Sequence, residues 1–145
     1  MTLEQADKIR LAKIIDFAEA ELNDLKDKFR SADFKKYTSD REFARNIERC
    51  LENIVNASLD IAKIVLVNEK LPIPDTYREY FLSLYTGNLV NEKTANILAD
   101  GVRLRNVLAH QYLDTRWDRI KKILTKDWQT YEQFFGFIKK DILSI

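Results

Sequence analysis

Apolar side chains recur at intervals of three and four residues along most of the chain, and glycine and proline rarely interrupt them. Only three Gly and two Pro occur among 145 residues. Sheet proteins need frequent turns, which these two residues usually supply, so their scarcity favours long helices with few connections. The length suits one domain, and 46% hydrophobic residues are enough to fill its core. We therefore predict an all-α protein whose single domain spans residues 1–145.

The spacing predicts four long helices and one short helix, most simply arranged as an antiparallel bundle. Capping boxes mark the N-terminal ends of the first two predicted helices, namely Thr2 with Gln5 and Ser39 with Glu42. Gly101 lies inside the fourth helix at a cost of roughly 1 kcal/mol relative to Ala, so we expect it to allow close packing or a bend. The predicted helices cover residues 2–29, 39–70, 77–85, 91–110 and 114–142, and residues 30–40 are predicted to be a polar loop.

The charge of the chain is nearly balanced overall but uneven along the sequence. A net charge of +1 gives no general attraction for nucleic acid. Between residues 101 and 122, however, six cationic side chains stand against Asp114 and Asp118. A run of charges is usually a solvated helix surface, and that interpretation stays open here. The six are Arg103, Arg105, Arg116, Arg119, Lys121 and Lys122.

Cysteine and histidine are too few for several classes of site. With one Cys and one His, neither an intrachain disulfide nor a Cys/His metal site can form, and no pair of carboxylates has a spacing typical of a metal site. We expect no metal and no cofactor, and we expect Cys50 to be a small core residue. The sequence has no signal-peptide pattern and no run of roughly 18 apolar residues, so we expect a cytoplasmic protein without membrane contact.

The segment from Leu104 to Tyr112 contains the residues best suited to chemistry. His110 is the single histidine, and histidine titrates nearest neutral pH, so it can accept and return protons. Arg105 carries a permanent charge on a planar fork that fits phosphate oxygens. Together they could cleave RNA without a metal. His110 would deprotonate the ribose 2'-hydroxyl or protonate the leaving oxygen, and Arg105 would stabilise charge on the phosphate.

Helix geometry complicates this pairing. Residues five apart lie about 140° apart around a helix, so Arg105 and His110 do not share a face. Arg105 must reach around the helix, meet His110 where the helix ends, or act with the histidine of a second subunit. Asn106 does share a face with His110 and could orient the imidazole. A structural interpretation also stays open, because an imidazole at a helix end can cap carbonyls and suits the helix dipole.

The same residues carry a resemblance to a known family. The chain resembles the HepT toxins of the HEPN superfamily, from MNT–HEPN toxin–antitoxin modules, whose signature is R-x-x-x-x-H-x-Y, usually with Asn after the Arg. Arg105, Asn106, His110 and Tyr112 match every position. The stretch from Tyr77 to Gly87 resembles the family's short helix and turn, and Glu48-Arg49 resembles an acidic–basic pair in its second helix. This likeness covers roughly residues 5 to 140.

The resemblance implies a fold and an activity. It implies a helical bundle that forms a homodimer with two-fold symmetry, in which the two motif helices build one groove. It also implies a metal-independent endoribonuclease toxin. We expect 2',3'-cyclic phosphate ends on the RNA, because the 2'-hydroxyl is the nearest nucleophile. Arg103 and Arg116 are possible RNA phosphate contacts, although solvated charge is the simpler interpretation. Trp117 and Trp128 are expected in the core or an interface rather than as base-stacking platforms.

The resemblance also implies how the activity is controlled. The partner would be a minimal nucleotidyltransferase antitoxin of a type VII-like module, which neutralises the toxin by adding adenylyl groups to Tyr112. An adenylyl group there would bring a negative phosphate beside Arg105. The alternative is a non-catalytic helical binding module that partners a nucleotidyltransferase, with the motif as a docking and modification site.

Overall fold

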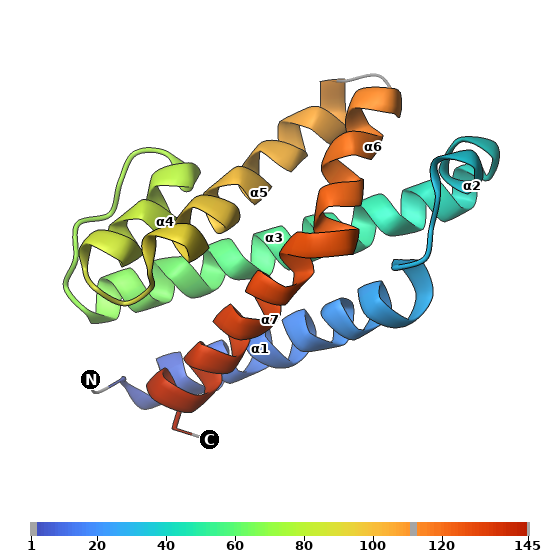
Figure 1. Cartoon of the computed structure of the whole chain (residues 1–145). Helices are drawn as coiled ribbons and strands as arrows, with labels where there is room; N and C mark the ends of the chain where they lie inside the picture. Colours follow the sequence, from blue (N-terminus) through green and yellow to red (C-terminus); the bar gives the residue numbers. More distant parts are fainter. Residues whose placement is uncertain (1–2, 111–112, 145) are drawn as a thin grey trace.

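The computed structural model describes residues 3–110 and 113–144, apart from the side chains of His110, Leu113 and Asp114. The regular structure in these ranges is helical, which confirms the predicted all-α class (Figure 1). Three π-helical segments, named η1 to η3, continue α-helices without a break. The elements are α1 (Gln5–Asp24), η1 (Leu25–Phe29), α2 (Phe34–Ser39), α3 (Arg41–Asn68), α4 (Tyr77–Thr86), α5 (Glu92–His110), α6 (Leu113–Lys122), η2 (Ile123–Asp127), α7 (Trp128–Phe137) and η3 (Ile138–Ile142).

The long helices run alternately up and down, as predicted for an antiparallel bundle. α1 packs along α3, and α5 packs against both α3 and the short α4. The chain then returns through α6 and α7, which cross the other helices and bring the C-terminal end beside the start of α1 (Figure 1). The two halves of the return differ in their neighbours, because α6 contacts α2 and α5 whereas α7 contacts α1 and α5.

The core consists of the apolar faces that the spacing predicted. All the apolar residues that recur at helical spacing in the first and the last predicted helix are buried. They are Leu11, Ile15, Ala18, Leu22, Leu25 and Phe29 in the first helix, and Trp117, Ile120, Leu124, Tyr131, Phe135, Ile138 and Ile142 in the last. Trp117 and Trp128 are both buried, as expected, and Trp117 packs against Tyr37 with ring centroids 5.3 Å apart. Cys50 is a buried core residue, and burial raises the pKa of its thiol to about 12.

The predicted loop over residues 30–40 is wrong in part, because it contains the helix α2. Asp33 begins this helix by accepting a hydrogen bond from the Lys36 amide at 2.8 Å. The helix is short, and Tyr37 is its buried side chain, so it shows no repeating apolar pattern. The predicted cap of the next helix is also off by one residue, since Asp40 rather than Ser39 accepts from the Phe43 amide. Thr2 lies outside the described residues, and α1 begins after Glu4.

Gly101 allows close packing, one of the two roles predicted for it. A Cβ at this position would lie 2.0 Å from the hydroxyl oxygen of Tyr131, which is fully buried on α7. The absence of a side chain at residue 101 therefore lets α7 lie against α5, the helix that carries the motif. Among the described residues, none of the helices has the length and apolar character required of a membrane span.

Candidate active site

Helix α5 presents the motif by burying one face and exposing the other. Asn91 starts the helix by accepting a hydrogen bond from the Thr94 amide at 2.8 Å. Leu104 and Leu108 are buried in the core. Arg105 and Asn106 lie on the other side of the helix and are exposed. The sequence thus places these two polar residues on the surface of a helix whose apolar face is fixed in the bundle.

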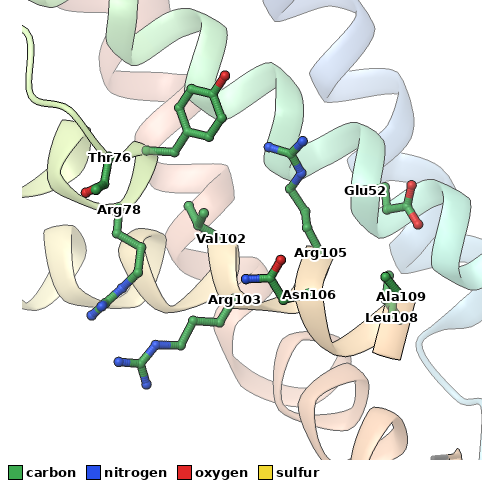
Figure 2. Close-up of a pocket in the computed structure, with 10 residues that line it drawn as sticks. Glu52, Thr76, Arg78, Val102, Arg103, Arg105, Asn106, Leu108 and Ala109 are labelled. Atoms are coloured by element: carbon green, nitrogen blue, oxygen red, sulfur yellow. The ribbon is translucent and has the colours of Figure 1, made fainter. Parts of the chain in front are cut away.

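These exposed residues line a groove between α4 and α5, which we call the Arg105 groove. Its volume is about 620 Å³, which is within the range typical of ligand sites. In Figure 2 the Arg105 side chain extends toward α3, whereas Arg78 and Arg103 lie together on the opposite side of the groove. The groove is lined by Glu52, Thr76, Tyr77, Arg78, Val102, Arg103, Arg105, Asn106, Leu108 and Ala109.

The Arg105 groove is cationic. Three arginines line it against a single carboxylate, that of Glu52. Arg105 forms no ion pair with any of the described carboxylates. Its guanidinium instead lies over the ring of Tyr77, with 5.6 Å from the guanidinium carbon to the ring centroid. An arginine without a carboxylate partner retains its charge and its donors for an incoming anion.

Most of the other cations in the basic segment are paired with acids. Asp100 accepts from Arg119 at 2.9 Å and from Lys122 at 3.2 Å, and lies 3.9 Å from Arg103. Burial alone would raise the pKa of the Asp100 carboxyl, but the hydrogen bonds from Lys122 and Arg119 outweigh it and lower that pKa. One carboxylate of α5 thus contacts three of the six cations, and Glu48 of α3 contacts a fourth, Arg116. Arg105 differs from these four in having no ion pair with a described carboxylate, and the solvated-surface interpretation of the segment stays open.

Arg116 lies in a structural network rather than in the Arg105 groove. Its guanidinium is 3.5 Å from the Glu48 carboxylate, which also accepts a hydrogen bond from Tyr37. Burial raises the pKa of the Tyr37 hydroxyl, and the bond to Glu48 raises it further. Glu48 thus joins α2, α3 and α6, while Arg49 is exposed. A phosphate contact by Arg116 stays a prediction, although its guanidinium is already paired with Glu48.

The remaining predicted residues stand near the end of the motif helix. His110 is the last residue of α5, and its side chain lies outside the described residues. Tyr112 lies outside them altogether. The catalytic role of His110, the orienting role of Asn106 and the modification of Tyr112 therefore stay predictions. Within the described side chains, no group of three or more His, Cys, Asp or Glu is placed to hold a metal ion.

The groove residues that come from outside α5, among them Glu52, Tyr77 and Arg78, could not be singled out from the sequence. Tyr77 and Arg78 open the short helix α4, and Glu52 comes from α3. Each is far from the motif in the sequence, and nothing in their local spacing distinguishes them from ordinary surface residues. The packing of α4 and α3 against α5 brings them together.

Comparison with known proteins assigns this arrangement to a family. Residues 4–138 match the family model described as Ribonuclease HepT-like. The chain belongs to the HepT-like ribonuclease family. One relative of this HepT-like chain is the mRNA nuclease HepT of Shewanella oneidensis, which is 30% identical over 96 residues. The matched region covers 66% of this chain and 69% of that relative.

Solved structures share the HepT-like fold. A chain in the structure of a tri-AMPylated Shewanella oneidensis HEPN toxin with its MNT antitoxin superposes with a TM-score of 0.78 at 22% identity. The likeness covers 89% of this chain and 96% of that one. A chain in a toxin–antitoxin structure with AMP-PNP gives a TM-score of 0.74 at 21% identity, over 93% and 98% of the two chains. These likenesses confirm the HEPN-like fold predicted from the motif.

Proposed function

We propose that this chain is the toxin of a toxin–antitoxin module and acts as a metal-independent endoribonuclease. The observation that carries the proposal is the guanidinium of Arg105, which has no ion pair with a described carboxylate and is exposed in a cationic groove on the helix that ends at His110. Membership of the HepT-like family supports the proposal, as does the relative described as an mRNA nuclease. RNA with accessible single-stranded positions is the expected substrate, because in-line attack needs a flexible backbone.

The proposed reaction uses the ribose as the nucleophile. The 2'-oxygen attacks the adjacent phosphorus, forming a new P–O bond while the bond to the 5'-oxygen of the next nucleotide breaks. One base takes the 2'-hydroxyl proton, and one acid returns a proton to the leaving 5'-oxygen. The products are a 2',3'-cyclic phosphate and a free 5'-hydroxyl. Arg105 binds the non-bridging oxygens and stabilises the charge that accumulates on them.

A homodimer would supply both proton-transfer groups. Each chain has one histidine, and one imidazole cannot be proton acceptor and proton donor in the same step. Two copies of α5 facing each other across a two-fold axis would place one His110 from each chain at a single phosphate. The arrangement also removes the difficulty that Arg105 and His110 point in different directions on one helix, because the Arg105 of one chain can act with the His110 of the other.

The proposed regulation involves a nucleotidyltransferase antitoxin and Tyr112. Adenylylation of Tyr112, two residues beyond His110, would add a negative phosphate close to the cationic Arg105 groove. That phosphate would compete with RNA for the guanidinium and cancel its charge. Arg103 has only a long ion pair with Asp100, and Arg78 has none with the described carboxylates, so both groove cations are also available to RNA.

The test combines purified protein with expression in a bacterial host. His110→Ala should abolish RNA cleavage and growth arrest, and Arg105→Ala should lower the cleavage rate roughly 10²–10³-fold. Lys121→Ala is the matched control, because Lys121 is also an exposed cation without a described ion pair but lies outside the groove. Its cleavage rate should equal that of the wild type. EDTA should leave cleavage intact, and the products should carry 2',3'-cyclic phosphate ends.

Two results would overturn the proposal. If wild-type protein expressed alone accumulated without harming the host and cleaved no RNA, the chain would be a non-catalytic partner of a nucleotidyltransferase. If EDTA removed the activity and a divalent metal restored it, the metal-independent mechanism would be wrong.

A further inference from the structure

A second hollow adjoins the Arg105 groove, and we call it the Tyr77 recess. Its volume is about 410 Å³, which is enough for a small-molecule ligand. Tyr77 and Arg105 line both hollows, so these two side chains form the wall between them. The recess is lined by Asn56, Leu59, Asp60, Lys63, Tyr77, Tyr80 and Arg105.

Tyr77 has the properties of a stacking platform. Tyr77 is 53% exposed, so its ring is accessible to a ligand in the groove. Tyr80 is buried and packs edge-on against it, with ring centroids 5.5 Å apart and planes at 87°. Tyr80 therefore holds the exposed ring in place. Proteins that bind single-stranded RNA place bases on exposed aromatic rings of this kind, next to cations that hold the backbone.

The opposite wall of the Tyr77 recess offers hydrogen-bonding groups that are not otherwise used. Asn56 and Asp60 lie four residues apart on α3, so they are neighbours on one helix face. Within the described part of the chain, neither side chain takes part in a hydrogen bond or an ion pair, and both are exposed. The Asp60 carboxylate can only accept hydrogen bonds, which suits an exocyclic amino group. The Asn56 amide can both donate and accept.

We propose that the Tyr77 recess binds the base of the nucleotide whose phosphate Arg105 holds, and that it prefers adenine, guanine or cytosine to uracil. The inference rests on the proposed function, because it assigns the phosphate to Arg105. The base stacks on Tyr77 while Asp60 accepts from its amino group. Uracil stacks as well but has no exocyclic amino group, and its O4 would stand where the amino group of cytosine or adenine lies, so that two acceptors would face each other at Asp60. The substrate class is thus single-stranded RNA with an unpaired, amino-bearing base at the cleavage site.

The experiment measures binding separately from cleavage. Hexamers with 2'-O-methyl riboses cannot be cut by 2'-hydroxyl attack, so their dissociation constants report binding alone. We compare oligo(A), oligo(U) and an abasic hexamer on the full-length chain. Wild-type protein should bind oligo(A) about tenfold more tightly than the abasic hexamer, as expected for stacking of one base. Tyr77→Ala should remove that difference by weakening oligo(A) binding alone, whereas Tyr77→Phe should keep it.

Two further variants sharpen the test. Tyr85→Ala is the matched control for Tyr77→Ala, because Tyr85 is an exposed tyrosine on the same helix that lines neither hollow. It should bind all three hexamers as the wild type does. Asp60→Asn should narrow the preference for oligo(A) over oligo(U), since an amide can donate to the carbonyl oxygens of uracil. Circular dichroism of each variant verifies that the fold is retained.

Specific outcomes would overturn the inference. Equal binding of oligo(A) and the abasic hexamer by wild-type protein would exclude a base subsite. Equal weakening of oligo(A) and abasic binding by Tyr77→Ala would exclude it too. If Tyr77→Ala changed only the mass of the assembly in sedimentation and not RNA binding, Tyr77 would belong to a protein contact. Failure of the proposed function gives a different result, namely no cleavage of unmodified RNA by the wild type, and leaves the binding comparison intact.

Discussion

Replacing Gly101 with alanine should destabilise the fold through one identifiable contact. The added Cβ would lie 2.0 Å from the Tyr131 hydroxyl oxygen and 3.3 Å from the ring carbon that bears it. Ordinary van der Waals contact begins at 3.4 Å, so the hydroxyl must move by about 1.4 Å. Tyr131 is 1% exposed and packs against Phe135, so its rigid ring has no free space to enter. Either α5 or α7 must therefore shift.

Two opposing effects set the size of the change. Inserting a methyl group into a packed core costs typically 1–3 kcal/mol, and a displacement above 1 Å belongs in the upper part of that range. Alanine recovers about 0.8–1.0 kcal/mol relative to glycine inside a helix. The net loss in free energy of unfolding should be about 1–2 kcal/mol. For a domain of this size, that corresponds to a fall in melting temperature of roughly 2–4 °C per kcal/mol.

Urea unfolding followed by circular dichroism measures this loss, and the chain provides its own controls. Gly136→Ala is the matched substitution, since a Cβ there would meet nothing within 4 Å, and it should stabilise by about 0.5–1 kcal/mol. Tyr131→Phe removes a buried hydroxyl that has no hydrogen-bond partner among the described residues, so it should be neutral or slightly stabilising. In a protein that already carries Tyr131→Phe, Gly101→Ala should lower the free energy of unfolding much less than it does in the wild type.

The double-mutant cycle makes the reasoning refutable. We expect a coupling free energy of about 1 kcal/mol or more between the two positions. If Gly101→Ala were as stable as the wild type, the contact between α5 and α7 would be looser than 2.0 Å implies. If it were destabilising to the same degree with and without the Tyr131 hydroxyl, the clash would not be the cause.

Two other predictions concern the half-buried Glu48 and the buried Asp127. Glu48→Ala leaves Arg116 and the Tyr37 hydroxyl without their shared partner, so urea unfolding should show a loss of roughly 1–3 kcal/mol in the free energy of unfolding. Glu132→Ala is the control, because it removes an exposed ion pair with Lys26 and should cost about 0–1 kcal/mol. Equal losses would contradict the network. Burial raises the pKa of Asp127 despite its ion pair with Lys122, so the contribution of Asp127 to stability should fall as pH rises from the unfolded pKa of 3.8 through the folded one. Asp127→Asn should therefore gain most over the wild type at neutral pH, and a pH-independent difference would refute this.

Much of the fold follows from the sequence because the helices are long and amphipathic. In α1 and along α3, apolar residues recur over several turns, so the pattern indicates both the helix and its buried face. The turn at Pro72 and Pro74 separates α3 from α4, as the restriction before proline predicts. The up-and-down topology then follows from short connections between long elements.

The errors occur where a local hydrogen bond or a tertiary contact decides the structure. The helix α2 is too short to show a period, and it exists because Asp33 caps it and Tyr37 is buried against Trp117. Asp40 and Ser39 are both good capping residues, and nothing in the spacing alone chooses between them. The π-helical segments in the final helix leave the apolar stripe continuous, so a sequence pattern does not reveal them.

The residues of the candidate site likewise fall into those that the sequence indicates and those that only helix packing brings together. The motif residues lie close together in the sequence, so Arg105, Asn106 and His110 could be singled out by their chemistry and by the family resemblance. Tyr77 and Arg78 gain their significance from α4 packing against α5, and Glu52, Asn56 and Asp60 from α3 doing so. The predicted chemistry therefore comes from one helix, while the surfaces that would select the RNA come from its neighbours.

This division bears on how the site can vary. Gly101 and Tyr131 fix α5 against α7 on its buried side, and Asp100 fixes it against α6 through Arg119 and Lys122. Neither anchor involves α4 or the exposed face of α3. Substitutions at Asn56 or Asp60 can consequently change which base is bound without moving α5, whereas Tyr77 also contacts the Arg105 guanidinium. Substitutions at Gly101 or Asp100 would move the helix that carries Arg105, and their effects on stability and on cleavage should therefore appear together.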